Sequence, residues 1–459
     1  MKFGGTSMGS AGRIEVAARI CALQRKTRPV VVVVSAMSKV TDMLLDTLRK
    51  AEAGDEHGVD ANIVALTRRH IECVTELLPL NDRIETIAGI ESLMADFRRI
   101  AHGVRMLGER PPRSVDEAIA IGEKLSALIL ARFLTRTGHP AQAVSGGDAI
   151  VTDALFGNAT PLMAETRAKA RSVLLPLLER NVFPVVTGFN GATADGRPTT
   201  LGRGGSDFSA SILAAALDAS ELWIWTDVDG IMSADPRLVK NARVLNEVTY
   251  NEAAELAYNG AKVLHPRTLA PLAERKIPVW SKNSFNLGVP GTRIVPVAES
   301  KPGPRAVTSM ANVALVSIEP ASSAVSGTRI MARALEALAA ANAEVLAFSS
   351  SSYRQSFCFL VRKDELAATL ANLAADLALE LTHGYLKPIE VDENVGLLAI
   401  VGEGMRGTPG LAGRIFSAIS RQDVNIIAIA QGSSEITISV VVRLDGLERA
   451  IRAVHEECS

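Results

Sequence analysis

The sequence predicts an α/β protein with a mainly parallel sheet layered between helices, followed by two ferredoxin-like α+β units. Over residues 1–295, short β-branched runs alternate with helical stretches, which is typical of βαβ units and a parallel sheet. A Pro-rich segment, residues 296–304, then interrupts the chain and reads as a linker. Beyond it, the order strand, helix, strand, strand, helix occurs twice, at a spacing of about 80 residues.

The first domain, residues 1–295, opens with a buried parallel strand at 30–34, a continuous β-branched run. Further strands are predicted at 141–144, 182–187, 222–226 and 278–281. Helices are predicted at 11–24, 84–107, 115–137, 163–180, 206–217 and 250–260. Residues 49–82 are helical and polar, and predict a peripheral hairpin.

The two C-terminal units are predicted at 306–380 and 391–459, either in sequence or with the second interleaved with the first. The first unit has strands at 313–318, 343–349 and 356–361 and helices at 327–341 and 364–377. The second has strands at 396–401, 424–430 and 435–442 and helices at 408–421 and 444–456.

Composition excludes several classes of protein. The chain has 459 residues with 49 Lys plus Arg and 50 Asp plus Glu, so its formal charge of −1 excludes nucleic-acid binding driven mainly by phosphate neutralisation. The four cysteines are scattered and predict neither a disulfide framework nor a zinc site. No apolar run approaches the ~20 residues that span a bilayer, and no signal peptide is evident, so we expect a cytoplasmic protein without membrane contact.

Two glycine-rich turns carry the first chemical signal. Residues 2–7 read Lys-Phe-Gly-Gly-Thr-Ser and residues 202–207 read Gly-Arg-Gly-Gly-Ser-Asp, each just before a predicted helix. Paired glycines let backbone N–H groups approach a phosphate, and a helix N-terminus adds positive potential. The alternative is that each segment is a plain turn before a helix, without a ligand. This alternative stays open for the first turn and is less favoured for the second.

Two further segments, one acidic and one glycine-rich, each match more than one known binding motif. Residues 226–237 follow a strand and hold three carboxylates in nine residues, but Leu238 occupies the closing position of an EF-hand, so a calcium loop is rejected. A loop at the carboxyl end of a parallel strand instead favours a nucleotide. Residues 402–407 match GxGxxG, but only 52 residues follow, too few for a dinucleotide-binding sheet.

Six blocks together resemble the aspartokinases of the amino-acid kinase superfamily. They are KFGGTS at 2–7, VVVVSAMSKVTDML at 31–44, GEKLSA at 122–127, TLGRGGSDFSA at 200–210, TDVDGIMSADPR at 226–237 and GAKVLHPRT at 260–268. The C-terminal units resemble ACT domains, the modules with which that family senses amino acids. The resemblance covers almost the whole chain, and implies an amino-acid kinase catalytic domain at 1–295.

The resemblance implies a role for each matching residue. Lys2, Asp207 and Lys262 are the expected catalytic residues, with Asp207 holding both lysines. The nucleotide is expected at Lys2, Gly4, Gly5, Ser7, Thr226, Asp227, Met232, Arg237 and Lys262. Aspartate is expected at Ser35, Thr41, Glu123, Arg203 and Ser206, with Glu123 receiving its ammonium and Arg203 its α-carboxylate.

The implied reaction is phosphoryl transfer from ATP to L-aspartate, giving ADP and 4-phospho-L-aspartate, the entry step to lysine, threonine, methionine and isoleucine. Mg²⁺ is expected on the ATP phosphates, with no metal site of the protein's own. We expect a monofunctional enzyme, because the sequence ends after the second ACT-like unit. The alternatives are another amino-acid kinase, such as one acting on acetylglutamate, and a non-catalytic amino-acid sensor.

The ACT resemblance also implies feedback inhibition and a homo-oligomer formed through the ACT units. A lysine pocket needs a carboxylate for the ε-ammonium, but the residue after Asn342-Ala343-Glu344-Val345 is Leu346. Glu344 could still substitute, because strand alternation places it on the same face. Asn425 and Gln431 frame a strand of the second unit and offer amide groups, so the sequence favours threonine as effector, with lysine as the alternative.

Overall fold

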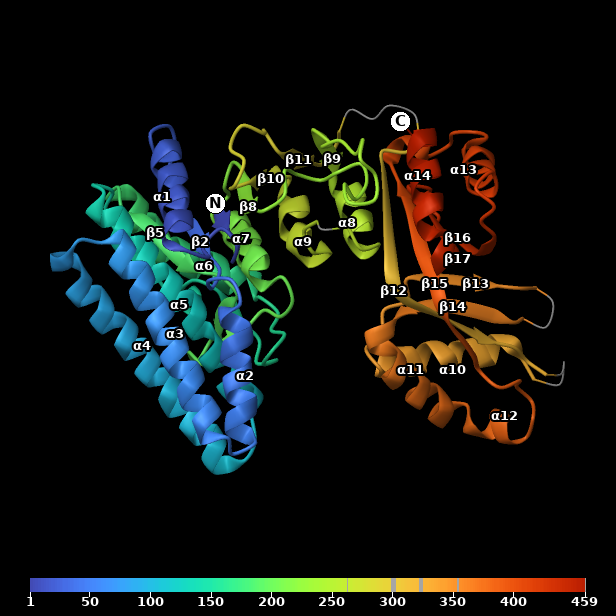
Figure 1. The fold of residues 1–459 in the computed structure, drawn as a ribbon, viewed down its shortest axis with the longest axis horizontal. Helices are drawn as coiled ribbons and strands as arrows, with labels where there is room; N and C mark the ends of the chain where they lie inside the picture. Colours follow the sequence, from blue (N-terminus) through green and yellow to red (C-terminus); the bar gives the residue numbers. More distant parts are fainter. Residues whose placement is uncertain (262, 299–302, 322–324, 353–354, 459) are drawn as a thin grey trace. The chain divides into compact units, whose positions relative to one another are not determined.

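The computed structural model describes residues 1–459 except 262, 299–302, 322–324, 353–354 and 459 (Figure 1). The described chain divides into two compact units, and each is presented by itself. Unit 1 comprises residues 1–231, 246–250 and 264–297, and unit 2 comprises residues 232–245, 251–263 and 298–459. These units are not continuous in sequence, so the linear boundaries at 1–295, 306–380 and 391–459 stay a prediction.

Unit 1 is built on an eight-stranded sheet in the order β3-β5-β2-β1-β8-β10-β11-β9. The strands are β1 (Lys2–Phe3), β2 (Val32–Val34), β3 (Ala141–Val144), β5 (Phe183–Thr187), β8 (Leu222–Thr226), β9 (Glu247–Thr249), β10 (Val279–Asn283) and β11 (Thr292–Val295). All neighbours are parallel except β10 and β11. The predicted mainly parallel sheet is therefore confirmed, with the very short β1 at its centre.

Helices cover both faces of this sheet (Figure 1). One face is covered by α1 (Ala11–Arg25) and α5 (Pro112–Arg136), with α2 (Val40–Glu52), α3 (Glu56–Leu77) and α4 (Leu80–Leu107) around them. The other face is covered by α6 (Met163–Glu179), α7 (Gly205–Ala216) and α9 (Pro266–Arg275). A small sheet of β4 (Val151–Thr152), β6 (Asn190–Thr193) and β7 (Pro198–Thr200) leads the chain into the second glycine-rich turn.

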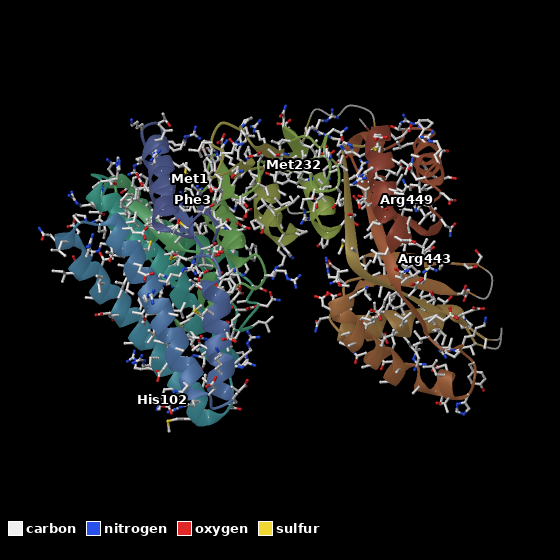
Figure 2. The ribbon with its side chains drawn as sticks, viewed as in Figure 1. Met1, Phe3, His102, Met232, Arg443 and Arg449 are labelled. Carbon is white, nitrogen blue, oxygen red and sulfur yellow. The ribbon has the colours of Figure 1, made fainter. Side chains whose placement is uncertain are left out.

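The predicted peripheral hairpin is more deeply packed than its polarity suggested. Val59, Ile63 and Leu66 of α3 are buried in the main core of unit 1, together with Phe3 of β1. The long helices α3 and α4 run side by side, and Figure 2 labels His102 near the C-terminal end of α4. The polar residues of this pair form the outward faces of helices that belong to the core.

Unit 2 contains a six-stranded antiparallel sheet in the order β13-β14-β12-β15-β17-β16. Its strands are β12 (Ala306–Ile318), β13 (Ala347–Ser350), β14 (Phe357–Arg362), β15 (Glu390–Val401), β16 (Ile426–Gln431) and β17 (Thr437–Arg443). Its helices are α8 (Tyr250–Tyr258), of which residues 251–258 belong to this unit, α10 (Gly327–Ala340), α11 (Lys363–Asp376), α12 (Ala378–Thr382), α13 (Leu411–Ser420) and α14 (Leu447–Cys458). The predicted order of strand, helix, strand, strand, helix therefore occurs twice.

The two halves of this sheet share their long strands. β12 pairs with β14 over residues 313–318, whereas its earlier residues, 306–310, pair with residues 397–401 of β15. Those residues of β15 also pair with β17. Helices α13 and α14 pack on the half that contains Leu398, and α10 and α11 pack on the half that contains Phe359. The two α+β units therefore form one continuous sheet.

Residues 232–245 and most of α8 precede the sheet in sequence but pack within unit 2. The Ser233 hydroxyl is hydrogen-bonded to His455 Nε2 of α14 at 2.9 Å, and Ala234 joins the core beneath α13 and α14. On α8, the buried Glu252 carboxylate pairs with Arg305 at 3.4 Å and accepts the backbone N–H of Glu403 at 2.9 Å. None of the described helices is both long and apolar enough to cross a membrane.

Candidate active site

A largely buried ion pair, whose Lys2 and Asp207 side chains are 9% and 23% exposed, joins the two glycine-rich turns. Lys2 lies on β1 between β2 and β8, and only 7% of its surface is exposed. Its Nζ lies 2.6 Å from Oδ1 of Asp207, which stands in the first turn of α7. The ion pair therefore holds the end of β1 next to the start of α7. Both glycine-rich turns, at residues 2–7 and 202–207, lie at the carboxyl edge of the sheet, where open α/β sheets bind ligands.

The glycines of the second turn are required by the backbone and by packing. Gly202 and Gly204 have φ angles of 74° and 69°, in the left-handed region that other residues rarely adopt. A Cβ on Gly205 would lie 2.4 Å from the ring of Phe189. Turn geometry thus explains these glycines by itself, and the case for an anion site rests on the adjoining Lys2 and on the exposed N-terminus of α7.

The first glycine-rich turn packs tightly against β8, the neighbour of β1 in the sheet, and against the loop after β2. The Gly4 N–H donates to the Trp225 carbonyl at 3.1 Å, and a Cβ on Gly5 would lie 3.1 Å from the Ala36 oxygen. Ser7 is 1% exposed, and its hydroxyl is hydrogen-bonded to Ser284 Oγ at 2.7 Å. Gly4 and Gly5 therefore form the turn itself, whereas the Ser7 side chain lies beneath it.

Glu123 of α5 is a buried carboxylate in this region. A Cβ on Gly122 would lie 2.8 Å from Cβ of Ala36, so glycine allows α5 to approach the loop after β2. Burial raises the pKa of Glu123 to about 8, against the opposing effects of the Ala36 N–H, the Glu123 backbone and the Lys2 charge. Its Oε2 is buried and has no hydrogen-bond partner among the residues that the structure describes. A ligand cation would satisfy this oxygen.

The other predicted aspartate contacts lie at the same edge of the sheet. Ser35 follows β2, and its N–H donates to the Phe3 carbonyl at 3.1 Å. Thr41 stands in the first turn of α2, and Ser206 precedes Asp207 on α7. Arg203 is exposed and has no ion-pair partner in the part of the chain that the structure describes. Its guanidinium is therefore available to a ligand carboxylate.

The predicted nucleotide segment is divided between the two units. Thr226 ends β8 and Asp227 follows it, both in unit 1, whereas Met232 and Arg237 belong to unit 2. Arg237 is paired with Asp235, with an Nη2 to Oδ2 distance of 2.5 Å. Lys262 lies outside the described residues. Within the described ranges, no three His, Cys, Asp or Glu side chains gather as a metal site would require.

Comparison with known proteins identifies the family. Residues 1–283 match the model of the amino acid kinase family, and residues 398–458 match an ACT domain model. The chain is 30% identical over 477 residues to aspartokinase 3 of Arabidopsis thaliana, covering 99% of this chain and 80% of that protein. The chain belongs to the aspartokinases. The family predicted from the sequence blocks is thus confirmed.

Other aspartokinases agree over the full length of the chain. A bifunctional aspartokinase/homoserine dehydrogenase of Arabidopsis thaliana is 35% identical over 462 residues, covering 99% of this chain and 50% of the relative, so the chain spans about half the length of such relatives. The structure of E. coli aspartokinase III with aspartate and ADP has a TM-score of 0.83 at 28% identity, covering 99% and 98% of the two chains. Clostridium acetobutylicum aspartate kinase gives 0.81 at 25%, covering 100% and 99%.

Sequence reasoning missed one cluster in this aspartokinase. Residues 283–286, which begin at the last residue of β10, contact the first glycine-rich turn, helix α1 and the segment after β8. Their letters, Asn-Ser-Phe-Asn, are those of an ordinary loop, and the partners Ser7, Arg13 and Asp229 are distant in sequence. A stricter search for paired Ser and Asn residues at the carboxyl ends of strands would have flagged the loop, but not its contacts.

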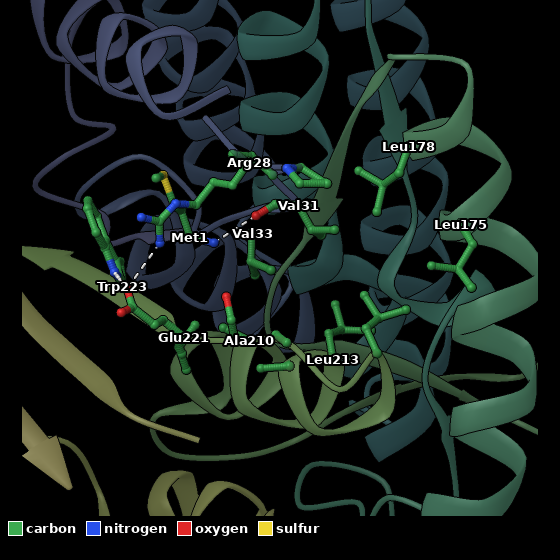
Figure 3. A pocket seen from close by; sticks show the side chains of 17 residues that line it. Met1, Arg28, Val31, Val33, Leu175, Leu178, Ala210, Leu213, Glu221 and Trp223 are labelled. Atoms are coloured by element: carbon green, nitrogen blue, oxygen red, sulfur yellow. Dashed lines mark hydrogen bonds and ion pairs between the residues drawn. The ribbon is translucent and has the colours of Figure 1, made fainter. Parts of the chain in front are cut away.

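Two cavities lie away from the ion pair. One of about 320 Å³ is lined by Met1, Val31, Leu213 and Trp223 at the amino ends of β1, β2 and β8, the edge opposite the glycine-rich turns (Figure 3). A second, of about 430 Å³ in unit 2, is lined by residues 405 and 407–413 with Gln431, Glu435 and Ile438. The structure thus places Gln431 in a cavity, whereas Asn425 is exposed and is not among its lining residues.

The raised pKa of Glu123 predicts a pH-dependent cost to stability. Between its ordinary pKa of 4.5 and about 8, the native state holds a proton that the unfolded chain releases, so stability falls as pH rises. We expect Glu123→Gln to raise the melting temperature relative to wild type, by an amount that grows from pH 5 to pH 8. Thermal unfolding without ligand measures this, with Glu117→Gln on the exposed face of α5 as the control. A gain that does not change with pH would contradict the assignment.

Proposed function

We propose that the chain is an aspartate kinase, which transfers the γ-phosphoryl group of ATP to the side-chain carboxylate of L-aspartate. The observation that carries this proposal is the buried Glu123 oxygen, which has no partner among the described residues, in a group whose pKa burial raises to about 8. A ligand ammonium would satisfy Glu123, while Lys2 would face the phosphoryl group. E. coli aspartokinase III, which has the same fold, is known in complex with aspartate and ADP.

The chemistry asks for positioning and positive charge rather than a protein nucleophile. The aspartate carboxylate is already ionised near pH 7, so no general base is needed. Phosphoryl transfer passes through a transition state with spread negative charge, which fixed cations stabilise. We assign that role to Lys2, oriented by Asp207, and to Lys262. Mg²⁺ on the ATP phosphates would supply further charge neutralisation.

The remaining residues recognise the two substrates in this proposal. Arg203 takes the α-carboxylate of aspartate, and Ser35, Thr41 and Ser206 supply polar contacts. Gly4, Gly5, Ser7, Thr226 and Asp227 of unit 1 are assigned to the nucleotide site, and Met232 and Arg237 of unit 2 are assigned to it on the resemblance alone. An acceptor without an ammonium, such as acetylglutamate, would leave the Glu123 oxygen buried and unsatisfied, which is costly. The cost of an unsatisfied buried oxygen also argues against the alternative in which Glu123 serves only the folded structure and binds no ligand.

We further propose that amino-acid binding to the ACT units inhibits the enzyme, with threonine favoured over lysine. The cavity at Gln431 is lined by Thr408 and other small or polar groups at the N-terminus of α13. The Glu435 carboxylate accepts the Gly407 N–H at 2.9 Å and so holds the loop around it. Glu344, the acid that might have served lysine, is paired with Arg362 at 3.2 Å.

The proposal extends to the assembly and its compartment. ACT units that pair with copies of themselves would give a homo-oligomer, as the resemblance implies. The four cysteines are free thiols, which suits the reducing cytoplasm where we place the enzyme.

The first test is trapping of the acyl phosphate with hydroxylamine in the presence of MgATP. We expect hydroxamate from L-aspartate and little from glutamate or acetylglutamate. Glu123→Gln should raise KM for aspartate at least about tenfold and change KM for ATP little, because only aspartate brings an ammonium. Glu117→Gln again serves as control. Hydroxamate formed from acetylglutamate in preference to aspartate would refute the substrate, and a change confined to KM for ATP would move Glu123 to the nucleotide site.

Lys2→Ala is expected to lower kcat by about 100-fold or more, because it removes positive charge from the transferring phosphoryl group. Lys262→Ala should act in the same way. The exposed Lys26, at the C-terminal end of α1, gives a matched Lys→Ala control that should keep full activity. Steady-state rates are compared at saturating substrates, with melting curves to confirm folding. Folded variants of Lys2 and Lys262 that both turn over normally would rule out the assignment.

Feedback control is tested by titrating threonine and lysine, separately and together, into the same assay. We expect threonine to inhibit, and Gln431→Ala to raise its half-inhibitory concentration about tenfold through loss of a hydrogen bond to the bound amino acid. Asn425→Ala tests the second predicted contact. Gln422→Ala, an exposed position after α13 and outside the cavity, is the control. Inhibition by lysine alone, unaffected by Gln431→Ala, would overturn the threonine proposal.

A further inference from the structure

The loop at residues 283–286, here called the Ser284 loop, lies between segments that are distant in sequence. β10 ends at Asn283, so the loop emerges at the carboxyl edge of the sheet beside β8. Ser284 is 2% exposed, and its N–H donates to the Thr226 carbonyl at 2.9 Å. The loop therefore begins with a backbone contact to the end of the strand that leads into the nucleotide segment.

The Ser284 hydroxyl connects this strand end to the first glycine-rich turn. It lies 2.7 Å from Ser7 Oγ and 3.2 Å from the Thr226 carbonyl oxygen. Ser7 also lies 3.4 Å from the Trp225 carbonyl oxygen. Both serines are buried, so these hydrogen bonds are shielded from water and losing one partner would leave the other unsatisfied. The spacing between residues 4–7 and residues 225–226 is thus set through two hydroxyl groups.

Arg13, in the first turn of α1, fixes the loop from the other side. Its Nη2 donates to the Ser284 carbonyl at 2.5 Å and to Ser284 Oγ at 2.8 Å. Its guanidinium lies over the Phe285 ring, 3.5 Å from the centroid. Over the described residues Arg13 has no carboxylate partner, so its charge is balanced by ring and carbonyl dipoles alone. An ion pair is therefore not what holds this arginine in place.

Asp229 is held by the same loop. Its Oδ1 accepts from Asn283 Nδ2 at 2.8 Å and from Asn286 Nδ2 at 3.2 Å. The Asn283 side-chain oxygen in turn accepts the Phe285 N–H at 2.8 Å. The Ser284 loop consequently contacts the nucleotide segment at both Thr226 and Asp229.

We propose that Ser284 and Arg13 are positioning residues for the nucleotide, which hold the first glycine-rich turn and the segment 226–229 at the spacing that ATP and ADP require. The proposal rests on the proposed function for the identity of the nucleotide. Neither residue is assigned a contact with substrate. Both act through Ser7, Thr226 and the loop itself, so their loss should affect nucleotide binding far more than aspartate binding.

The test measures Mg·ADP binding by calorimetry together with KM for ATP and aspartate, in the full-length chain. Ser284→Ala and Arg13→Gln are each expected to weaken Mg·ADP binding and raise KM for ATP about fivefold, the scale of a lost buried hydrogen bond, with KM for aspartate changed less than about twofold. Arg13→Lys keeps the charge but not the fork or the stacking, and should recover only part of the loss. Thr47→Ala on α2 removes an equally buried hydroxyl, bonded to Met43 of its own helix and to Asn62 of α3 and away from the Ser284 loop, and is the control.

A double-mutant cycle separates positioning from simple loss of stability. If the Ser7–Ser284 contact sets the spacing, the ADP-binding defects of Ser7→Ala and Ser284→Ala should be less than additive in the double variant, whatever direct contact Ser7 makes with the nucleotide. Ser284→Thr, which retains the hydroxyl, provides a second folded variant and should bind ADP better than Ser284→Ala. Lower melting temperatures with unchanged ADP affinity and unchanged KM for ATP would overturn the proposal. Failure of the wild type to phosphorylate aspartate would refute the function, while the ADP measurements would still decide the positioning role.

Discussion

The arrangement of the site depends on the buried ion pair between Lys2 and Asp207. It links the end of the central strand β1 to the first turn of α7, and so places the two glycine-rich turns at one edge of the sheet. The Lys2 side chain is almost fully removed from water and that of Asp207 is partly exposed, and their attraction offsets the cost of burial only when the geometry is good. Such a pair contributes more to the placement of its residues than to net stability. In this protein the ion pair keeps the Lys2 side chain in one orientation, although the strand that carries it is very short.

Glu123 shows the opposite use of burial. Gly122 lets α5 approach Ala36, and the carboxylate is then enclosed with one oxygen unsatisfied. A chain selected for stability alone would place an apolar residue here, because a buried carboxyl that resists ionisation destabilises the folded state above its ordinary pKa. Helix α5 keeps its place despite this cost, because many of its other residues are apolar and buried. Buried polar atoms without a partner are expected at sites that complete their hydrogen bonds only when a ligand binds.

Most of the fold was predictable because it depends on local pattern. Strand β3 and strand β8 were predicted at their observed residues, and α7 within one residue at each end, since β-branched runs and helical periodicity are local signals. The long strand β15 was predicted only at its apolar second half, because its exposed first half, starting at Glu390, lacks a clear apolar alternation. The Ser284 loop was missed for a different reason: its role lies in tertiary contacts with Ser7 and Arg13, and no sequence spacing encodes these.

The division into two units bears on how regulation would reach the site. The chain passes between the units after residues 231, 245, 250, 263 and 297, so the first crossing falls within the nucleotide segment and the fourth within the block at 260–268. Helix α8 leads into that block, and its Glu252 binds the Glu403 N–H, two residues before the loop that lines the Gln431 cavity. Glu252 therefore connects α8, which precedes the block at 260–268 in sequence, to the segment beside the Gln431 cavity.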